Sequence, residues 1–284
     1  FTVLTIGLLL NLTVVFAYIK STLLSEGKPY HHLIFNIITS NSISCLVVAP
    51  FLIFNFTDPG IRYLTPTKYS CIAALFGFHM AFDSTLTGLL LITCDRLFAI
   101  VSPLQHMHRV SRKTCRIAIV ASWLYLTIKN GMVFFWNVRK PGEPCILIMV
   151  ETLAYAQVYN FNFYACIGFI VIFNIVLLVC VIISKRKGEQ MKAPQAMSEA
   201  VRRNLNNLKL AKIVLLVVSI LLITWIPHNT LAKMVIYDID HKRPIRYGIL
   251  VAFNLSRGLC MITIVTDPII FFWRNAQCRA AVLR

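Results

Sequence analysis

The chain has 284 residues, of which 58% are hydrophobic and 14% are charged, and its formal net charge is +17 at pH 7. Ordinary soluble domains are about half apolar and about a quarter charged, so this composition excludes an ordinary soluble domain and favours a membrane protein. A large positive charge is compatible with nucleic-acid binding, but membrane proteins also carry excess lysine and arginine on their cytoplasmic loops. We favour the second explanation and expect no nucleic-acid partner.

Seven apolar segments are long enough to cross a bilayer, because a membrane helix needs about 20 apolar residues. We therefore expect one all-α domain over 1–284, an integral membrane bundle of seven helices. A short amphipathic tail at 273–283 is expected to lie along the membrane surface as an eighth helix. The first and last segments lie close to the chain ends, so we expect the natural protein to have longer tails. The expected spans are 1–24, 31–56, 69–101, 114–138, 158–185, 204–237 and 246–272.

Basic residues are distributed unequally between the two ends of the expected bundle. Seventeen lysines and arginines flank one end and eight flank the other. The richer end normally faces the cytoplasm, so we expect a multi-pass plasma-membrane protein with an extracellular N-terminus and a cytoplasmic C-terminus. The eight residues at the other end are Arg62, Lys68, Arg139, Lys140, Lys233, Lys242, Arg243 and Arg246.

Two of the nine cysteines, Cys71 and Cys145, lie in polar connecting segments. Both fall on the extracellular side of the expected topology, where oxidising conditions permit a disulfide. We predict a bond between them, with two free thiols as the alternative. Asn55 begins a candidate glycosylation sequon on the same side, close to the membrane.

Four charged residues stand out within the apolar segments. Asp95 and Arg96 end a long apolar run at the expected cytoplasmic exit of the third helix, and Asp83 and Lys129 lie inside the third and fourth helices. Charged groups inside a membrane are costly and are often functional. We predict an ion pair between Asp83 and Lys129, with a role for either residue in a ligand pocket as the alternative.

Several motifs follow one another on successive expected helices. They are Asn11, Asp95-Arg96-Leu97, Trp123, Thr224-Trp225-Ile226-Pro227 and Asp267-Pro268-Ile269-Ile270-Phe271. In this order they resemble the motifs of the rhodopsin-like (class A) G-protein-coupled receptors, and the resemblance covers nearly the whole chain. The tripeptide at Asp95 is similar to the family's Asp-Arg-Tyr, and the last two motifs are similar to Cys-Trp-x-Pro and Asn-Pro-x-x-Tyr.

The resemblance implies a receptor, not an enzyme, that transmits extracellular ligand binding to a heterotrimeric G protein, with arrestin as a further partner. Arg96 would contact the G protein, and Trp225 with Pro227 would act as an activation toggle. One alternative is a constitutively active receptor that requires no ligand. A transporter is a more remote alternative.

Two family positions have exchanged residues. Asn41 stands nine residues before Pro50, where the family usually has aspartate, and Asp267 stands where the family usually has asparagine. Mammalian gonadotropin-releasing hormone receptors show a similar exchange. We expect a hydrogen-bonded polar core of Asn11, Asn41, Thr85 and Asp267, with two unrelated polar residues as the alternative, and we regard a family-type sodium site as doubtful.

Other departures affect the expected cytoplasmic switch. Leu97 and Phe271 replace tyrosines, and Asn207 replaces a glutamate that pairs with the helix-three arginine in many relatives. Arg96 would then have only Asp95 nearby, so we predict measurable basal activity.

The resemblance also directs attention to an outer ligand pocket. Phe78 stands where amine receptors have aspartate, and Met261 stands where opsins have the lysine that binds retinal. We therefore expect neither a monoamine nor retinal, and we favour a peptide or a small anionic or lipid ligand. Arg257 would bind the carboxylate or phosphate of the ligand. The alternative is that Arg257 pairs with Asp238, Asp240 or Glu151. The expected ligand-binding residues are Phe78, His79, His228, Asn229, Lys233, Arg257 and Met261.

Overall fold

The computed structural model describes residues 2–21, 24–25, 28–64, 66, 68–138, 145, 150, 152–190, 199–241, 243–244, 246–274 and 279–280. Within these ranges, the side chains of 52–53, 55–56, 153, 181, 184–190, 199–211, 236, 239–240 and 273–274 are not described. The described residues are almost entirely helical. The helices are α1 (Thr2–Lys20), α2 (Tyr30–Phe56), α3 (Asp58–Leu64), α4 (Lys68–Val101), α5 (Pro103–Arg109), α6 (Arg112–Gly131), η1 (Met132–Phe134), α8 (Leu153–Gln190), α9 (Glu199–Asp240), α10 (Tyr247–Cys260) and α11 (Ile262–Arg274).

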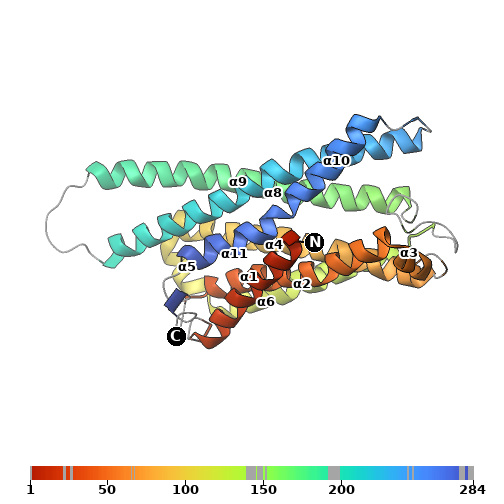
Figure 1. Cartoon of the computed structure of the whole chain (residues 1–284). Coiled ribbons are helices and arrows are strands. Elements are labelled where there is room, and N and C mark those ends of the chain that lie inside the picture. Colours follow the sequence, from red (N-terminus) through yellow and green to blue (C-terminus); the bar gives the residue numbers. More distant parts are fainter. Residues whose placement is uncertain are drawn as a thin grey trace.

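Seven stretches of this helical chain are long and apolar enough to cross a membrane. They form a bundle of long helices in which α5 lies at one end and α3 lies at the other (Figure 1). We call these the Arg96 end and the disulfide end, after Arg96 near the end of α4 and the Cys71–Cys145 bond near its beginning. The predicted all-α seven-helix membrane fold is confirmed.

Helix α4 lies at the centre of the bundle, because it packs against α2, α6, α8 and α9. Close packing of α4 against α2 depends on Gly88. A β-carbon at this position would lie 2.9 Å from Cγ1 of Ile37, closer than side chains tolerate. Both helices place polar side chains in this interface, so the site described below is assembled largely along α4.

The predicted disulfide between Cys71 and Cys145 is present. It joins the first turn of α4 to the segment that precedes α8, and both cysteines are buried in an apolar cluster. The bond closes a loop with a sequence separation of 74 residues. In the chain-entropy account, a loop of this length contributes about 4 kcal/mol of stability by restricting the unfolded chain.

Several predicted helix boundaries are wrong. The fourth span ends as α6 at Gly131 and continues only through the short turn η1, and the fifth span begins at Leu153. Two short helices, α3 and α5, lie in connections between the expected spans. The predicted tail helix at 273–283 falls mostly outside the described residues. Of that segment, 273–274 complete α11 and 279–280 are helical.

The last apolar segment is not one continuous helix but is divided into α10 and α11 at Met261. The amide of Met261 donates to the carbonyl of Gly258, and the amide of Ile264 donates to the carbonyl of Met261, both at 3.2 Å. These are the three-residue spacings of a tight turn rather than the four-residue spacings of an α-helix. The hydroxyl of Thr263 satisfies the carbonyl of Cys260 at 2.8 Å.

Candidate functional site

The buried Asp95–Arg96 pair lies near the end of α4. Only 2% of the Arg96 surface is exposed. Its Nε donates to Oδ2 of Asp95 at 2.8 Å, and its Nη2 contacts the same oxygen. Ser102 interrupts the helix shortly afterwards, and Pro103 then starts α5. The pair therefore sits at the point where the chain leaves the bundle.

Two further residues hold this pair, and both come from other helices. The Arg96 guanidinium carbon lies 4.7 Å from the ring centroid of Tyr30, at the beginning of α2. Nε2 of His106, in α5, lies 2.9 Å from Oδ1 of Asp95. The expectation that Arg96 has only Asp95 nearby is therefore wrong, because helix packing places an aromatic ring against the guanidinium.

The other predicted switch residues have different surroundings. Phe271 is 4% exposed and packs in the main apolar core, while Leu97 is partly buried. Asn207 lies within α9, but its side chain is outside the described part of the structure. Among the described side chains, the carboxylate bonded to Arg96 is that of its neighbour Asp95.

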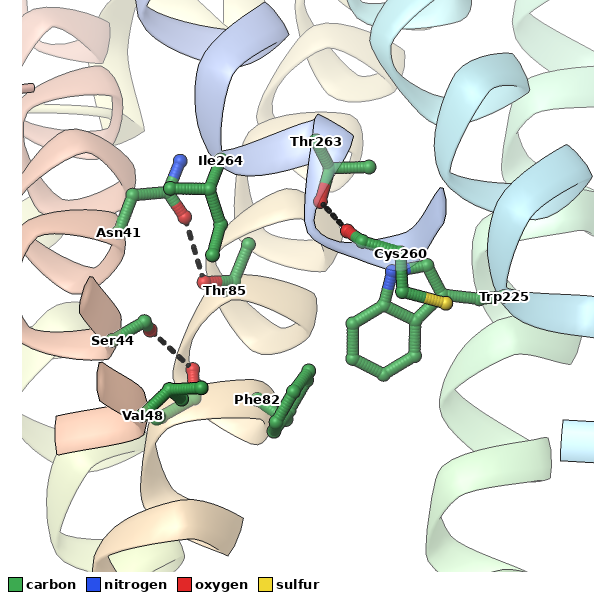
Figure 2. Close-up of a pocket in the computed structure, with 10 residues that line it drawn as sticks. Asn41, Ser44, Val48, Phe82, Thr85, Trp225, Cys260, Thr263 and Ile264 are labelled. Carbon is green, nitrogen blue, oxygen red and sulfur yellow. Dashed lines mark hydrogen bonds between the residues drawn. The ribbon is translucent and has the colours of Figure 1, made fainter. Parts of the chain in front are cut away.

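The exchanged residues Asn41 and Asp267 contact each other directly. Nδ2 of Asn41 donates to Oδ2 of Asp267 at 3.1 Å, and the hydroxyl of Thr85 donates to Oδ1 of Asn41 at 2.9 Å. Asn41 is fully buried, and Asp267 is 2% exposed. The bond between Thr85 and Asn41 is drawn in Figure 2. One hydrogen-bonded chain therefore links α4, α2 and α11.

Asn11 joins this region through the backbone of α11. Its Nδ2 donates to the carbonyls of Gly7 and Ile264, at 2.7 Å and 2.9 Å. Pro268 has no N–H, so the Ile264 carbonyl lacks its usual partner four residues later. The Asn11 amide supplies that partner. Helix α1 can approach so closely because a β-carbon at Gly7 would lie only 2.7 Å from Cγ2 of Ile264.

A small cavity separates this polar core from Trp225 (Figure 2). The centre of a water molecule can occupy about 10 Å³ of it, which is room for about one water. Phe82 meets the Trp225 ring edge-on at 5.0 Å, and Phe163 stacks on it at 5.8 Å. The expected toggle is thus enclosed by rings from α4 and α8. The lining residues are Asn41, Ser44, Val48, Ala81, Phe82, Thr85, Trp225, Cys260, Thr263 and Ile264.

The seven predicted ligand-binding residues do not come together in one place. Phe78 and Met261 pack with an apolar cluster between α1, α2 and α4. His79 is 2% exposed and lies against Tyr155 and Tyr159 of α8. These two tyrosines were not predicted, because nothing in the local pattern of α8 shows which face meets α4.

The remaining predicted ligand residues lie on α9 and α10. Nδ1 of His228 lies 3.1 Å from Oγ of Ser256, and Nδ2 of Asn229 donates to the carbonyl of Trp225. Arg257 donates to the side chain of Asn254 at 2.9 Å. Lys233 is exposed, and its Nζ lies 3.9 Å from the ring centroid of Tyr164 on α8.

The predicted ion pair between Asp83 and Lys129 is present between α4 and α6. Nζ of Lys129 lies 2.5 Å from Oδ2 of Asp83, and the two residues are 8% and 4% exposed. The same ammonium group lies 4.8 Å from the ring centroid of Tyr159, and Asn130 lies near the carboxylate. This buried cluster therefore joins three helices, with α8 contributing the aromatic face.

A family model described as "7 transmembrane receptor (rhodopsin family)" matches residues 10–271. The chain belongs to this family. The motif-based resemblance to rhodopsin-like receptors is therefore confirmed. The family comprises signalling receptors and not enzymes. Within the described residues, no group of three or more His, Cys, Asp or Glu side chains could hold a metal ion.

Individual receptors are only distantly similar. Melanopsin-A of Danio rerio is 25% identical over 80% of this chain and 39% of its own length. Sphingosine 1-phosphate receptor 2 of Homo sapiens is 23% identical over 92% of this chain and 69% of its own length. Cannabinoid receptor 1 of Xenopus laevis is 23% identical over 98% of this chain and 60% of its own length. The chain spans between about two fifths and three fifths of the length of the melanopsins that it matches.

Proposed function

We propose that this member of the rhodopsin family is a receptor that couples an extracellular ligand to a heterotrimeric G protein. The observation that carries the proposal is the buried Arg96, held by Asp95 and Tyr30 where α4 leaves the bundle. Ligand binding would shift the population of bundle states. Movement of the Arg96 end of α9 away from α4 would then expose Arg96 to a G-protein helix.

This proposal places the Arg96 end in the cytoplasm and the N-terminus outside. Exposed basic residues follow Arg96 in α5 and α6, as is typical of cytoplasmic connections. The disulfide lies at the opposite end, which is consistent with an oxidising exterior. Arrestin is proposed as a second partner at the same cytoplasmic surface.

The experiment that tests this function measures nucleotide exchange by each G-protein class in membranes containing the receptor. Each measurement is made without ligand and with a panel of candidate ligands, which comprises acidic peptides, lysophospholipids and long-chain carboxylates. We expect exchange above that of membranes without receptor, and loss of that exchange in Arg96→Leu at equal surface amount. The proposal fails if well-expressed receptor promotes no exchange, with or without the panel.

For the ligand we propose a peptide or a small anionic or lipid molecule. One relative is named for sphingosine 1-phosphate, whose phosphate is anionic. The position of Met261 argues against a covalently bound retinal, and that of Phe78 against a monoamine. No sodium ion is assigned to the polar core in this proposal.

Arg257 is the proposed partner of the ligand's anionic group. Its guanidinium donates to the amide oxygen of Asn254 and lies beside the Phe253 ring, so the half-buried side chain is held along α10. Hydrogen bonds to charged groups contribute about 1.5–3 kcal/mol. We therefore expect Arg257→Ala to lower the potency of a carboxylate or phosphate agonist from the panel by about 10- to 100-fold.

The matched control for this prediction is Arg246→Ala, which removes an exposed arginine next to the first turn of α10. Concentration–response curves for both variants should be compared at equal surface amounts. Equal potency in Arg257→Ala and wild type would show that Arg257 serves another partner. The acids Asp238, Asp240 and Glu151 then become its candidates.

A second candidate function is signalling without a required ligand. It is favoured because, among the described side chains, no carboxylate from another helix forms an ion pair with Arg96. Tyr30 opposes it by covering the guanidinium. A cation–π contact of this kind contributes about 1–2 kcal/mol when partly desolvated.

We expect Tyr30→Ala to raise ligand-independent exchange by about 5- to 30-fold, because its loss frees Arg96. Tyr30→Phe retains the aromatic face and is the matched control, so its basal exchange should remain near that of wild type. The measurement is the rate of nucleotide exchange without ligand in both variants and in wild type. Unchanged basal exchange in Tyr30→Ala would remove Tyr30 from the switch.

A further inference from the structure

Tyr30, whose ring covers Arg96, begins α2 at a helix end that has no side-chain cap. Pro29 occupies the capping position and makes no side-chain hydrogen bond to the helix. The first backbone N–H groups of a helix lack partners within it, and a capping side chain normally supplies one. Because this end of α2 has no such cap, another contact is needed to hold its first turn and the Tyr30 ring in place.

His31, the second residue of α2, makes a contact of this kind. Its Nδ1 atom forms a hydrogen bond of 3.3 Å with the hydroxyl of Tyr18 in α1. His31 is 7% exposed and Tyr18 is 1% exposed. A hydrogen bond in such a buried place is electrostatically stronger than one in water. We call this bond the Tyr18–His31 tether, because it ties the beginning of α2 to the end of α1.

The α1 side of the tether is well fixed. The Tyr18 ring lies 5.9 Å from the rings of both His31 and Phe35, measured between centroids. His31 and Phe35 are four residues apart and therefore lie on one face of α2. The hydroxyl of Ser21 donates to the carbonyl of Tyr18 at 3.1 Å. Tyr18 is thus part of the packed interface between α1 and α2, and its hydroxyl can hold a partner in position.

His31 in turn contacts Tyr30. The centroids of these two rings are 4.4 Å apart, and the Tyr30 ring centroid lies 4.7 Å from the Arg96 guanidinium carbon. Arg96 is also close enough to His31 to act on it electrostatically. A continuous series of contacts therefore runs from α1, through the first turn of α2, to the buried arginine of α4.

We propose that Tyr18 and His31 are positioning residues for the switch, because their hydrogen bond holds the Tyr30 ring over Arg96. Loss of the tether would loosen the first turn of α2 and uncover the guanidinium. Helix α1, which carries none of the predicted switch residues, would then help to keep the receptor inactive. The effect on signalling rests on the proposed function, whereas the effect on the exposure of Arg96 does not.

The first test needs no G protein. Phenylglyoxal, a dicarbonyl that modifies arginine, is added to the full chain purified in detergent, and peptide mass spectrometry measures the labelling rate of Arg96. The exposed Arg109 is the internal standard. Tyr18→Phe removes only the hydroxyl of the tether, and we expect it to speed the labelling of Arg96 by about 2- to 5-fold. The matched control is Ser21→Ala, which removes a neighbouring hydroxyl of the same helix end and should label at the wild-type rate.

A second set of variants distinguishes positioning from general loosening of the bundle. His31→Phe keeps an aromatic ring against Tyr30 but removes the nitrogen, so it should match Tyr18→Phe, and combining the two should add little. In a Tyr30→Ala background, Tyr18→Phe should not speed the labelling of Arg96 further, because the covering ring is already absent. Thermal unfolding of each variant shows that it is folded.

Ligand-independent nucleotide exchange is then measured on the same variants and should rise in the same order as the labelling of Arg96. Wild-type labelling in Tyr18→Phe would overturn the tether. So would equal acceleration by Tyr18→Phe with and without Tyr30, because its effect would then not pass through that ring. Faster labelling without exchange by any variant would support the tether and contradict the proposed function.

Discussion

Reversing either charge of the Asp83–Lys129 pair alone is expected to abolish most surface expression. In Asp83→Lys or Lys129→Asp, two like charges would face each other in a site where both residues are less than 10% exposed. Removing one partner of a buried ion pair costs about 3–5 kcal/mol, which is a large part of the stability of a typical domain. Surface labelling and thermal unfolding of the solubilised receptor measure the effect.

Reversal of both charges together is expected to be partly tolerated, because opposite charges again meet between α4 and α6. Recovery should be incomplete, because the Tyr159 ring now lies 4.8 Å from the ammonium group and would instead meet a carboxylate. Lys113→Glu, an exposed reversal on the same helix, is the control and should have little effect. A double reversal that is as damaging as the two single reversals combined would contradict a simple pair and favour a pocket role.

Asn41→Asp is expected to impair folding or signalling, and adding Asp267→Asn is expected to restore it. The single change removes the amide that donates to Asp267 at 3.1 Å and places two carboxylates in a fully buried site. Leaving such a buried group without its partner costs about 1–3 kcal/mol. The double variant again pairs one amide with one carboxylate, and Thr85 can donate to the new carboxylate.

The measurement is a double-mutant cycle on thermal stability and agonist-induced exchange, because non-additivity identifies residues in contact. Asn36→Asp is the matched control. It alters another buried amide of α2, which accepts from Trp123, and Asp267→Asn should not rescue it. Additive effects of Asn41→Asp and Asp267→Asn would show that the exchange of residues is not a functional pairing.

Some contacts of the candidate site could be predicted because they follow from matching positions in a shared fold. The resemblance placed Asn41 and Asp267 in one polar core, and the two residues are hydrogen-bonded there. The disulfide was predictable because Cys71 and Cys145 lie in polar segments on the same side of the expected membrane. In these cases, the order of the spans and the side of the membrane limited the available partners.

Other contacts depend on the rotation of each helix about its own axis. Tyr30 and Arg96 are far apart in the sequence, and nothing near either residue indicates that the Tyr30 ring covers the Arg96 guanidinium. The same applies to the seven predicted ligand residues, which share the outer half of the expected bundle but face different neighbours. Asn11 was expected to be hydrogen-bonded within the polar core of Asn41, Thr85 and Asp267, yet its amide donates to the carbonyl of Ile264, which Pro268 leaves free.

The number of spans, their approximate positions and the receptor family followed from the sequence itself, because hydrophobic length and short motifs are local properties of the chain. The tertiary structure alone decided the break at Met261, the covering of Arg96 by Tyr30, and the approach of Tyr159 on α8 to the Asp83–Lys129 pair. An apolar stretch determines that a helix enters the membrane. The partners of a buried polar side chain are decided only when the seven helices pack, since those partners come largely from other helices.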